Sequence, residues 1–317
     1  MALPRIAMGA WAWGNDGTFG GKQDEGTLRD VFDTAMENGL CLWDTAYAYG
    51  AGQSEKVLGG FIRGLPRGSF MISDKLTPQM MDTSSPHPVK DMLDMQLSIM
   101  GLDRFDIYWI HNTAGAPEWT RRVAEYFEGR DDAPMIGVSN HDLSEIMQAD
   151  EILQGHGLRL SAVQNHYSLI NRSSEHSGIL EYCRENGITF FSYMVLEQGA
   201  LTGKYDPSHP MPEGSARAQT YNPLMDKLEV INAKLSEIAA RHGVSTAQIP
   251  VAWAIAKGTL PIIGVTGKKQ VEDAVKAANV ELCDDEIAEM EETADRFGLN
   301  AIRFWEKEMR RCQAKRS

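Results

Sequence analysis

The sequence predicts an α/β protein of the (β/α)8 TIM-barrel class. Eight short apolar runs alternate with helix-like segments along the 317 residues. The connections are long enough for crossovers between parallel strands, and chemically active side chains follow several of the runs. An open, doubly wound sheet is the alternative. It would carry a glycine-rich dinucleotide turn after an early strand, and no GxGxxG motif occurs.

The predicted strands are runs of apolar residues that stop at a glycine or a polar side chain. The first stops at Gly14, whereas the second turns polar at Asp44 and closes on Gly50. The eight strands span residues 6–13, 40–43, 69–74, 105–110, 135–138, 160–163, 188–192 and 260–265.

The predicted helices carry apolar residues at three- and four-residue spacing. In the first of them Leu28, Val31, Phe32 and Ala35 form the stripe, and Gly39 follows as a C-cap. The helices span residues 25–38, 54–63, 88–100, 118–127, 142–153, 176–185, 227–242, 246–256 and 268–278, with a C-terminal helix at 284–296.

The rhythm of strands and helices breaks only at residues 206–222. This stretch is rich in proline, serine and threonine, so we expect a long excursion without a helix. No linker divides the chain, and we expect one barrel domain over residues 1–317, with the C-terminal helix and tail at about 284–317.

Composition limits the classes of function. The chain is 43% hydrophobic and 24% charged, which is ordinary globular composition. Its net charge of −13 disfavours nucleic-acid binding. The four scattered cysteines form no metal motif and indicate reduced thiols. Neither a signal peptide nor a membrane-spanning run is evident, so we expect a cytoplasmic protein without a bound metal or a membrane partner.

Four polar side chains follow three consecutive predicted strands. Asp44 ends the second strand and Tyr49 lies in its loop, while Lys75 ends the third and His111 the fourth. The carboxyl ends of parallel barrel strands meet at one rim, where catalytic residues collect. The sequence therefore predicts an acid, a phenol, an ammonium and an imidazole in one site. His141 and His166 also follow strands, but they come without a matching acid and base and are interpreted as structural.

This group suits protonation of an oxygen. A cation about 4 Å from a phenolate, at an effective dielectric near 20, stabilises it by roughly 4 kcal/mol, or about three pKa units. We therefore expect Lys75, held by Asp44, to lower the pKa of Tyr49 and make it a general acid. A neutral His111 would polarise a carbonyl oxygen. The site supplies no hydride, so reduction needs a cofactor.

The segment Asp44-Thr45-Ala46-Tyr47-Ala48-Tyr49-Gly50, followed by Ser54-Glu55, resembles the signature of the aldo-keto reductase family. The resemblance extends from Gly9 to about Arg296. It implies an NADPH-dependent reductase of aldehydes or ketones, or the reverse alcohol dehydrogenase, with Asp44, Tyr49, Lys75 and His111 as the catalytic tetrad.

The resemblance also implies cofactor contacts. Ser139, Asn140 and Gln164 match the residues that hold the nicotinamide carboxamide, and Tyr193 matches the aromatic that stacks on the ring. The loop with Gly199, Leu201 and Lys204 resembles the one that covers the pyrophosphate. Toward the adenosine, the matching turn and helix hold Thr266, Lys268, Gln270 and Asp273. The positive charge there favours NADPH over NADH.

Aromatic residues near the rim indicate an apolar substrate pocket. The expected walls are Trp11, Trp13, Trp119, Phe304 and Trp305. A small carbonyl compound is the expected partner, while the physiological substrate, the direction of reaction and the oligomeric state do not follow from the sequence. Two further functions remain open: a cofactor-binding redox sensor or scaffolding subunit with slow turnover, and a lyase or isomerase that recycles bound NADP.

Overall fold

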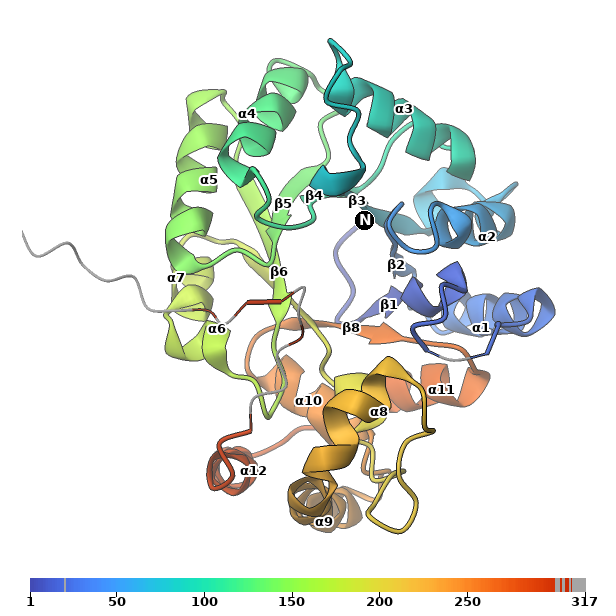
Figure 1. Ribbon diagram of the computed structural model, residues 1–317, viewed down its shortest axis with the longest axis vertical. Helices are drawn as coiled ribbons and strands as arrows, with labels where there is room; N and C mark the ends of the chain where they lie inside the picture. The colour runs from blue at the N-terminus through green and yellow to red at the C-terminus, as the bar shows by residue number, and fades with distance from the viewer. Residues whose placement is uncertain (20, 300–302, 304–305, 308, 310–317) are drawn as a thin grey trace, which may run out of the picture.

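The predicted (β/α)8 barrel is confirmed. The computed structural model describes residues 1–19, 21–299, 303, 306, 307 and 309. Its parallel strands close in sequence order, each pairing with the next and the last with the first (Figure 1). The strands are β1 (Ala7–Gly9), β2 (Leu42–Asp44), β3 (Met71–Leu76), β4 (Ile107–Ile110), β5 (Met135–Ser139), β6 (Leu160–His166), β7 (Thr189–Tyr193) and β8 (Leu260–Gly264).

Helices surround the strands on all sides (Figure 1). They are α1 (Glu25–Glu37), α2 (Gln53–Ile62), α3 (Pro88–Met100), α4 (Ala116–Phe127), α5 (Leu143–Gly155), α6 (Ser173–His176), α7 (Ile179–Glu185), α8 (Ala216–Tyr221), α9 (Met225–His242), α10 (Gln248–Ala256), α11 (Lys268–Ala277) and α12 (Asp284–Asp295). Short 3-10 turns are η1 (Trp11–Gly14), η2 (Arg67–Ser69), η3 (Pro78–Met80), η4 (Glu197–Gly199) and η5 (Asn222–Leu224). The described helices are too short or too polar to cross a membrane.

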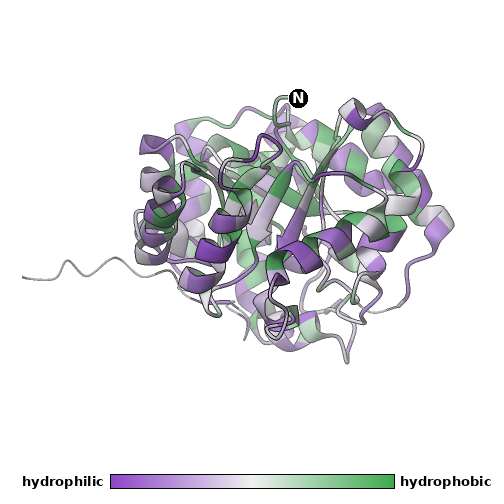
Figure 2. Ribbon diagram, turned by 90° about the horizontal axis from the view of Figure 1, so that it is seen from above, coloured by the Kyte–Doolittle hydropathy of each residue, from purple (hydrophilic) through white to green (hydrophobic). Residues whose placement is uncertain are grey.

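Two apolar cores hold the barrel together. The larger lies between the strands and the helices, whose faces carry both hydrophobic and hydrophilic residues (Figure 2). The smaller comes from strand side chains alone, which fill the inside of the barrel. Its buried members are Ala7, Leu42, Met71, Ile107, Trp109, Ala162, Phe191, Leu260 and Ile262.

The first predicted strand is too long. Only Ala7–Gly9 form β1, and the residues from Trp11 to Gly14 turn into η1. The backbone N–H of Trp13 bonds back to the carbonyl of Ala10, and the Trp13 indole donates to the carbonyl oxygen of Val265 at 2.8 Å. These bonds bend the chain across the end of the barrel.

Two helices also differ from the prediction. The stretch 206–222 was expected to lack a helix, but it contains α8, because Ser215 caps the amide of Ala218 and Tyr221 buries its ring. The predicted helix at 176–185 is instead two short helices, α6 and α7, separated at Gly178, whose φ of 89° is left-handed.

Candidate active site

Lys75 is fully buried at the C-terminal end of β3. Its Nζ lies 2.6 Å from Oδ2 of Asp44 and donates to the carbonyl oxygen of Thr45 at 2.7 Å. Burial alone would lower the pKa of Lys75, but the charge of Asp44 and the neighbouring Tyr49 phenol outweigh it, so the pKa is raised. The ammonium therefore stays charged at neutral pH.

Asp44 is held from its other oxygen as well. Its Oδ1 accepts from Ser73 Oγ at 2.8 Å and from Gln164 Nε2 at 3.1 Å. Ser73 accepts in turn from the indole of Trp109 at 2.6 Å. Because β2 and β3 pair in a register that sets Asp44 beside Ser73, these contacts follow from the strand alignment. These contacts hold the Asp44 carboxylate in the orientation in which its other oxygen pairs with Lys75.

Tyr49 lies above this ion pair. The Lys75 ammonium is 4.9 Å from the centre of the Tyr49 ring. The ring stacks on Trp11 at 5.6 Å and meets the edge of the His111 ring at 5.9 Å. The structure thus brings together Asp44, Tyr49, Lys75 and His111 from three strand ends, as the sequence predicts.

The expected lowering of the Tyr49 pKa is wrong. Burial raises the pKa of this phenol, and the opposing charge of Lys75 only partly offsets that, while Asp44 adds to it. The sequence estimate counted the ammonium but not the desolvation of the phenolate or the carboxylate behind the lysine. Tyr49 therefore keeps its proton at neutral pH and is available as a donor.

His111 follows β4 and is neutral. Burial and the charge of Lys75 lower its pKa to about 3. Its Nδ1 lies 2.7 Å from the hydroxyl oxygen of Thr77, a residue that the sequence analysis did not single out. Thr77 comes two residues after Lys75, so a polar side chain just past a strand end was the available signal.

Ser139, Asn140 and Gln164 meet at neighbouring strand ends. The register of β5 and β6 sets Ser139 beside Gln164, and the Asn140 backbone N–H donates to the Gln164 carbonyl at 3.1 Å. Asn140 has a left-handed φ of 62°. Its side-chain amide donates to the carbonyl of His111 and accepts from the Tyr193 hydroxyl. An amide, a hydroxyl and a phenol therefore line one side of the rim.

Residues 5–295 match the model of the Aldo/keto reductase family.

This chain belongs to the aldo/keto reductase family.

Relatives support this assignment over most of the chain. It is 32% identical to the chloroplastic pyridoxal reductase of Arabidopsis thaliana, over 93% of this chain and 84% of that protein. It is 28% identical to the NADH-specific methylglyoxal reductase of Escherichia coli, over 93% of this chain and 96% of that protein.

The solved structures of other members share the fold. The glycerol dehydrogenase of Gluconobacter oxydans matches with a TM-score of 0.81 at 22% identity, covering 96% of this chain and 95% of that one. An aldo-keto reductase from Klebsiella pneumoniae in complex with NADPH matches with a TM-score of 0.72 at 21% identity, covering 97% and 95%.

The segments that resemble the family's pyrophosphate and adenosine contacts lie beyond β7 and β8. Gly199 has a φ of 101° in η4, the Leu201 side chain is buried, and Lys204 lies over the ring of Tyr205. Gln270 accepts from the backbone amides of Thr266 and Gly267, at 2.6 and 3.0 Å, and thereby closes the turn that begins α11.

The charges at this turn are already paired. Lys268 lies 3.0 Å from Asp30 and Lys269 3.3 Å from Asp273, whose carboxylate also accepts from Gln248 at 2.7 Å. Lys268 and Lys269 remain more than half exposed, so these ion pairs are weak and can exchange for an anionic ligand.

Only one of the predicted pocket walls lies beside the tetrad in the part of the chain that the structure describes. Trp11 stacks on Tyr49. Trp13 does not face the rim, because it is fully buried against Trp43 and Phe61. Trp119, on α4, is 8% exposed and belongs to the larger core. Phe304 and Trp305 lie outside the described residues.

Two surface cavities among the described residues lie away from the tetrad. One, of about 450 Å³, is formed by residues 62–70 and 100–103, and the other, of about 490 Å³, by residues 86–90 and 118–126. The candidate site is located by the chemistry of the strand ends.

An acidic pair is buried behind the site. Glu55, from the family-like signature, and Asp74, on β3, are both completely buried. Burial raises the pKa of both carboxyl groups, and the neighbouring Glu55 raises that of Asp74 further. Neither Glu55 oxygen has a hydrogen-bond donor in the described structure. A hydrogen bond between the two carboxyl groups requires a proton on one of them, and the raised pKa values favour that proton; such a bond links α2 to β3.

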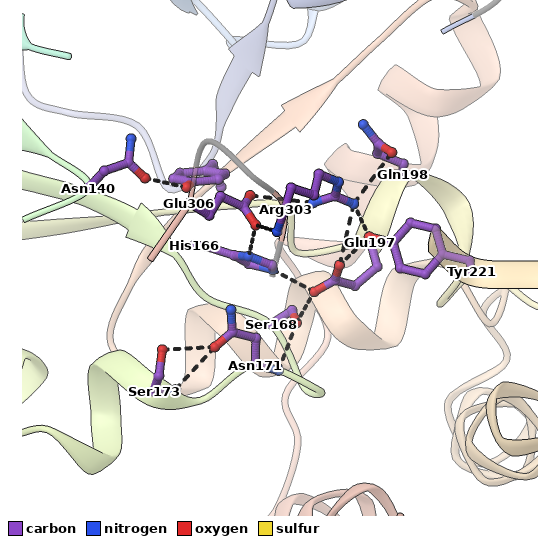
Figure 3. Close-up of polar contacts among 11 residues, drawn as sticks. Asn140, His166, Ser168, Asn171, Ser173, Glu197, Gln198, Tyr221, Arg303 and Glu306 are labelled. Atoms are coloured by element: carbon purple, nitrogen blue, oxygen red, sulfur yellow. Dashed lines mark hydrogen bonds and ion pairs between the residues drawn. The ribbon is translucent and has the colours of Figure 1, made fainter. Parts of the chain in front are cut away.

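A second charged cluster surrounds His166 (Figure 3), whose ring stacks on that of Tyr193. His166 Nε2 lies 2.6 Å from Glu197 Oε1, and His166 Nδ1 lies 3.0 Å from Glu306 Oε2. The interpretation of His166 as lacking an acid is therefore wrong. Glu306 is 140 residues away along the chain, so no local pattern pointed to it.

Arg303 completes the charge balance of this cluster. Its guanidinium contacts the Tyr221 hydroxyl and lies 3.9 Å from Glu197 Oε2 and 3.4 Å from Glu306 Oε1 (Figure 3). Two cations and two carboxylates are thus buried together. Since buried charges are stable only when paired, this set holds residues 303 and 306 against the ends of β6 and β7.

Proposed function

We propose that this oxidoreductase transfers a hydride from NADPH to an aldehyde or ketone, with Tyr49 as the proton donor to the resulting alcohol. The observation that carries the proposal is the buried ion pair of Lys75 and Asp44 directly beneath a protonated Tyr49. An ammonium that stays charged when buried stabilises the phenolate left after proton transfer.

Tyr49 and His111 have different roles at the carbonyl oxygen of the substrate. When bound, reduced nicotinamide supplies the hydride. Tyr49 gives its proton to the oxygen on which negative charge develops, and the electron pair of the O–H bond stays on the phenolate beside Lys75. His111, neutral because of its burial, donates a hydrogen bond to the same oxygen from Nε2 when Thr77 donates to Nδ1.

The residues present fit a nicotinamide carboxamide. Gln164 donates its side-chain N–H to Asp44. The side-chain carbonyl oxygen of Gln164 is therefore available to accept a hydrogen bond from the carboxamide. Ser139 and Asn140 offer a hydroxyl and an amide at the next strand end. Tyr193, tied to Asn140, offers a ring face. We assign these four residues to the nicotinamide end.

We assign the loop with Gly199, Leu201 and Lys204 to the pyrophosphate, and the α11 turn with its lysines to the adenosine phosphate. A helix N-terminus and positive side chains favour the additional phosphate of NADPH. The cofactors in the names of relatives differ: the Escherichia coli relative is named NADH-specific, and a Schizosaccharomyces pombe relative is named for NADP(+). Titration of the purified protein with each reduced cofactor tests this choice, and tighter binding of NADH would reject it.

We propose a small carbonyl compound as the substrate. Trp11 beside Tyr49 offers an apolar wall. Relatives named pyridoxal reductase and methylglyoxal reductase support carbonyl reduction.

The test follows the loss of reduced-nicotinamide absorbance with a panel of aldehydes, ketones and sugars. Wild type should turn over at least one class, and Tyr49→Phe should retain cofactor binding while losing at least about 100-fold in turnover, as expected for loss of a general acid. Full turnover by Tyr49→Phe would disprove the mechanism. Tight cofactor binding without turnover of any carbonyl would instead favour a sensor or scaffolding role.

A further inference from the structure

Tyr193 has a charged partner on its ring. The rings of Tyr193 and His166 stack with their centres 5.6 Å apart and their planes 30° from parallel. The Tyr193 hydroxyl donates to Oδ1 of Asn140. The phenol is therefore fixed at two points, by an imidazole on its ring and by an amide at its tip.

The imidazole is itself fixed from both nitrogens. Glu197 accepts from Nε2 and Glu306 accepts from Nδ1, and all three side chains are at most 2% exposed. The Glu197 backbone has a left-handed φ of 47°, which is strained for a residue with a side chain. The contacts of its carboxylate with His166, Ser168 and Tyr221 stabilise this conformation.

We propose that His166 is a positioning residue for the aromatic platform under the nicotinamide, and that Glu306 from the C-terminal segment completes this platform. The C-terminal segment then determines how tightly the cofactor binds, in addition to any part it plays in shaping the substrate site. This inference rests on the proposed function.

The contacts give the inference its physical basis. Without Glu306, His166 loses a hydrogen-bond acceptor and one of two negative neighbours, so its ring can turn about its bond to the strand. Rotation would remove the stacking surface under Tyr193 and loosen the hydroxyl bond to Asn140. Tyr193 and Asn140 both belong to the set that we assign to the nicotinamide, so the first measurable effect is a change in cofactor affinity.

The experiment uses the full chain and compares three variants. Glu306→Gln and His166→Gln change the platform, whereas Lys307→Gln is the matched control from the same segment. Lys307 pairs with Asp142 and Glu145 at the N-terminal end of α5, and its described ion pairs do not include His166. The control therefore removes a charge from the same segment while leaving every hydrogen-bond partner of His166 in place.

The first readout is the dissociation constant for NADPH, from quenching of protein fluorescence. We expect about tenfold weaker binding for Glu306→Gln and His166→Gln, the size of one lost charged hydrogen bond, and less than about a twofold change for Lys307→Gln. The KM for the carbonyl at saturating cofactor should change much less. Unchanged NADPH binding in both platform variants, or an equal loss in Lys307→Gln, would overturn the inference.

The second readout is pH. Burial lowers the pKa of His166, but Glu197 and Glu306 outweigh it and raise the pKa to about 9. The other ionisable groups of the cluster are Arg303, Tyr193 and Tyr221, whose pKa values are raised beyond their ordinary range. Because the imidazolium is present below its pKa, NADPH affinity should fall as pH rises through about 9, and Glu306→Gln should move this fall to lower pH. A pH-independent affinity, or an unmoved midpoint, would contradict the role of His166.

The third readout needs no cofactor. In nuclear magnetic resonance spectra of the free protein, Glu306→Gln should lower the His166 titration midpoint and shift the side-chain amide of Asn140, whereas Lys307→Gln should do neither. If wild type binds neither dinucleotide, the proposed function fails, and this spectrum still decides whether Glu306 acts on Asn140 through His166 and Tyr193. An unmoved Asn140 amide would overturn that coupling.

Discussion

Gly50 packs against Gly14 so closely that a methyl group on Gly50 would lie 2.0 Å from the carbonyl oxygen of Gly14. Gly50 also has a left-handed φ of 69°, which favours glycine. From the other side, a methyl group on Gly14 would lie 2.6 Å from the backbone of Tyr49. The loop that carries the candidate acid is therefore positioned by direct contact between two backbones.

The first prediction concerns this contact. Gly14→Ala and Gly50→Ala should push the Tyr49 loop outward and reduce turnover by at least about tenfold, since a shift near 1 Å misplaces a catalytic group. Steady-state kinetics and thermal unfolding measure the effect. Gly60→Ala in α2 is the control, because a methyl group there meets nothing within 4 Å and should leave turnover intact. Normal activity in Gly14→Ala would refute the positioning argument.

The second prediction concerns the buried ion pair. Lys75→Met should abolish turnover and cost about 3–5 kcal/mol of unfolding free energy, because Asp44 is left buried without its cation. The double variant Asp44→Asn/Lys75→Met should regain much of that stability but no activity. Urea unfolding and the absorbance assay measure both. If the double variant is no more stable than the single one, the carboxylate is not the source of the loss.

The third prediction concerns His111. Thr77→Val removes the hydroxyl beside Nδ1, so the neutral imidazole is no longer held as an Nε2 donor. We expect about a tenfold lower kcat, worth near 1.4 kcal/mol, with little change in KM. Thr77→Ser keeps the hydroxyl and should restore the rate. Equal kinetics for Val and Ser at this position would show that the hydroxyl has no role.

The fourth prediction concerns the acidic pair of Glu55 and Asp74. Burial raises the pKa of Asp74 well above 3.8, so the folded protein holds a proton that the unfolded chain releases. The stabilisation that this bound proton gives is fully present below the pKa of Asp74 in the unfolded chain. It is lost as the pH rises through the higher pKa of Asp74 in the folded protein. Asp74→Asn has no such proton. As the pH rises above about 4, the unfolding free energy of Asp74→Asn should therefore increase relative to that of wild type, by up to about 1.4 kcal/mol per pH unit.

Urea unfolding at several pH values measures this difference. Glu55→Gln should behave in the same direction, since it removes the other half of the pair. Parallel stability curves for wild type and Asp74→Asn between about pH 5 and pH 8 would mean that no proton is shared.

The strand ends could be predicted from sequence because each is a local signal. Asp44, Lys75 and His111 follow apolar runs, and the parallel closure of the barrel brings these three positions into one site. How deeply the site is buried, in contrast, depends on residues far apart in the sequence. The pKa of Tyr49 depends on how much water its ring loses and on which charges surround it, so the sign of the shift could not be read from the neighbouring lysine alone.

The cluster around His166 could not be predicted for the same reason. Its partners come from η4 and from the C-terminal segment, at 31 and 140 residues along the chain. For Trp13 the local sequence signal was present but misleading. It follows the first strand and suggested a pocket wall, but the chain bends into η1 and turns the indole into the core.

The pairing of β1 with β8 has a consequence for the synthesis of this protein. Met8 lies beside Ile263, so one edge of the first strand has no partner until nearly the whole chain has left the ribosome. Until then the nascent chain exposes two open sheet edges and part of the lining of the barrel, which invites aggregation. Versions of the chain that stop before Leu260 should therefore accumulate as insoluble protein instead of as smaller working units.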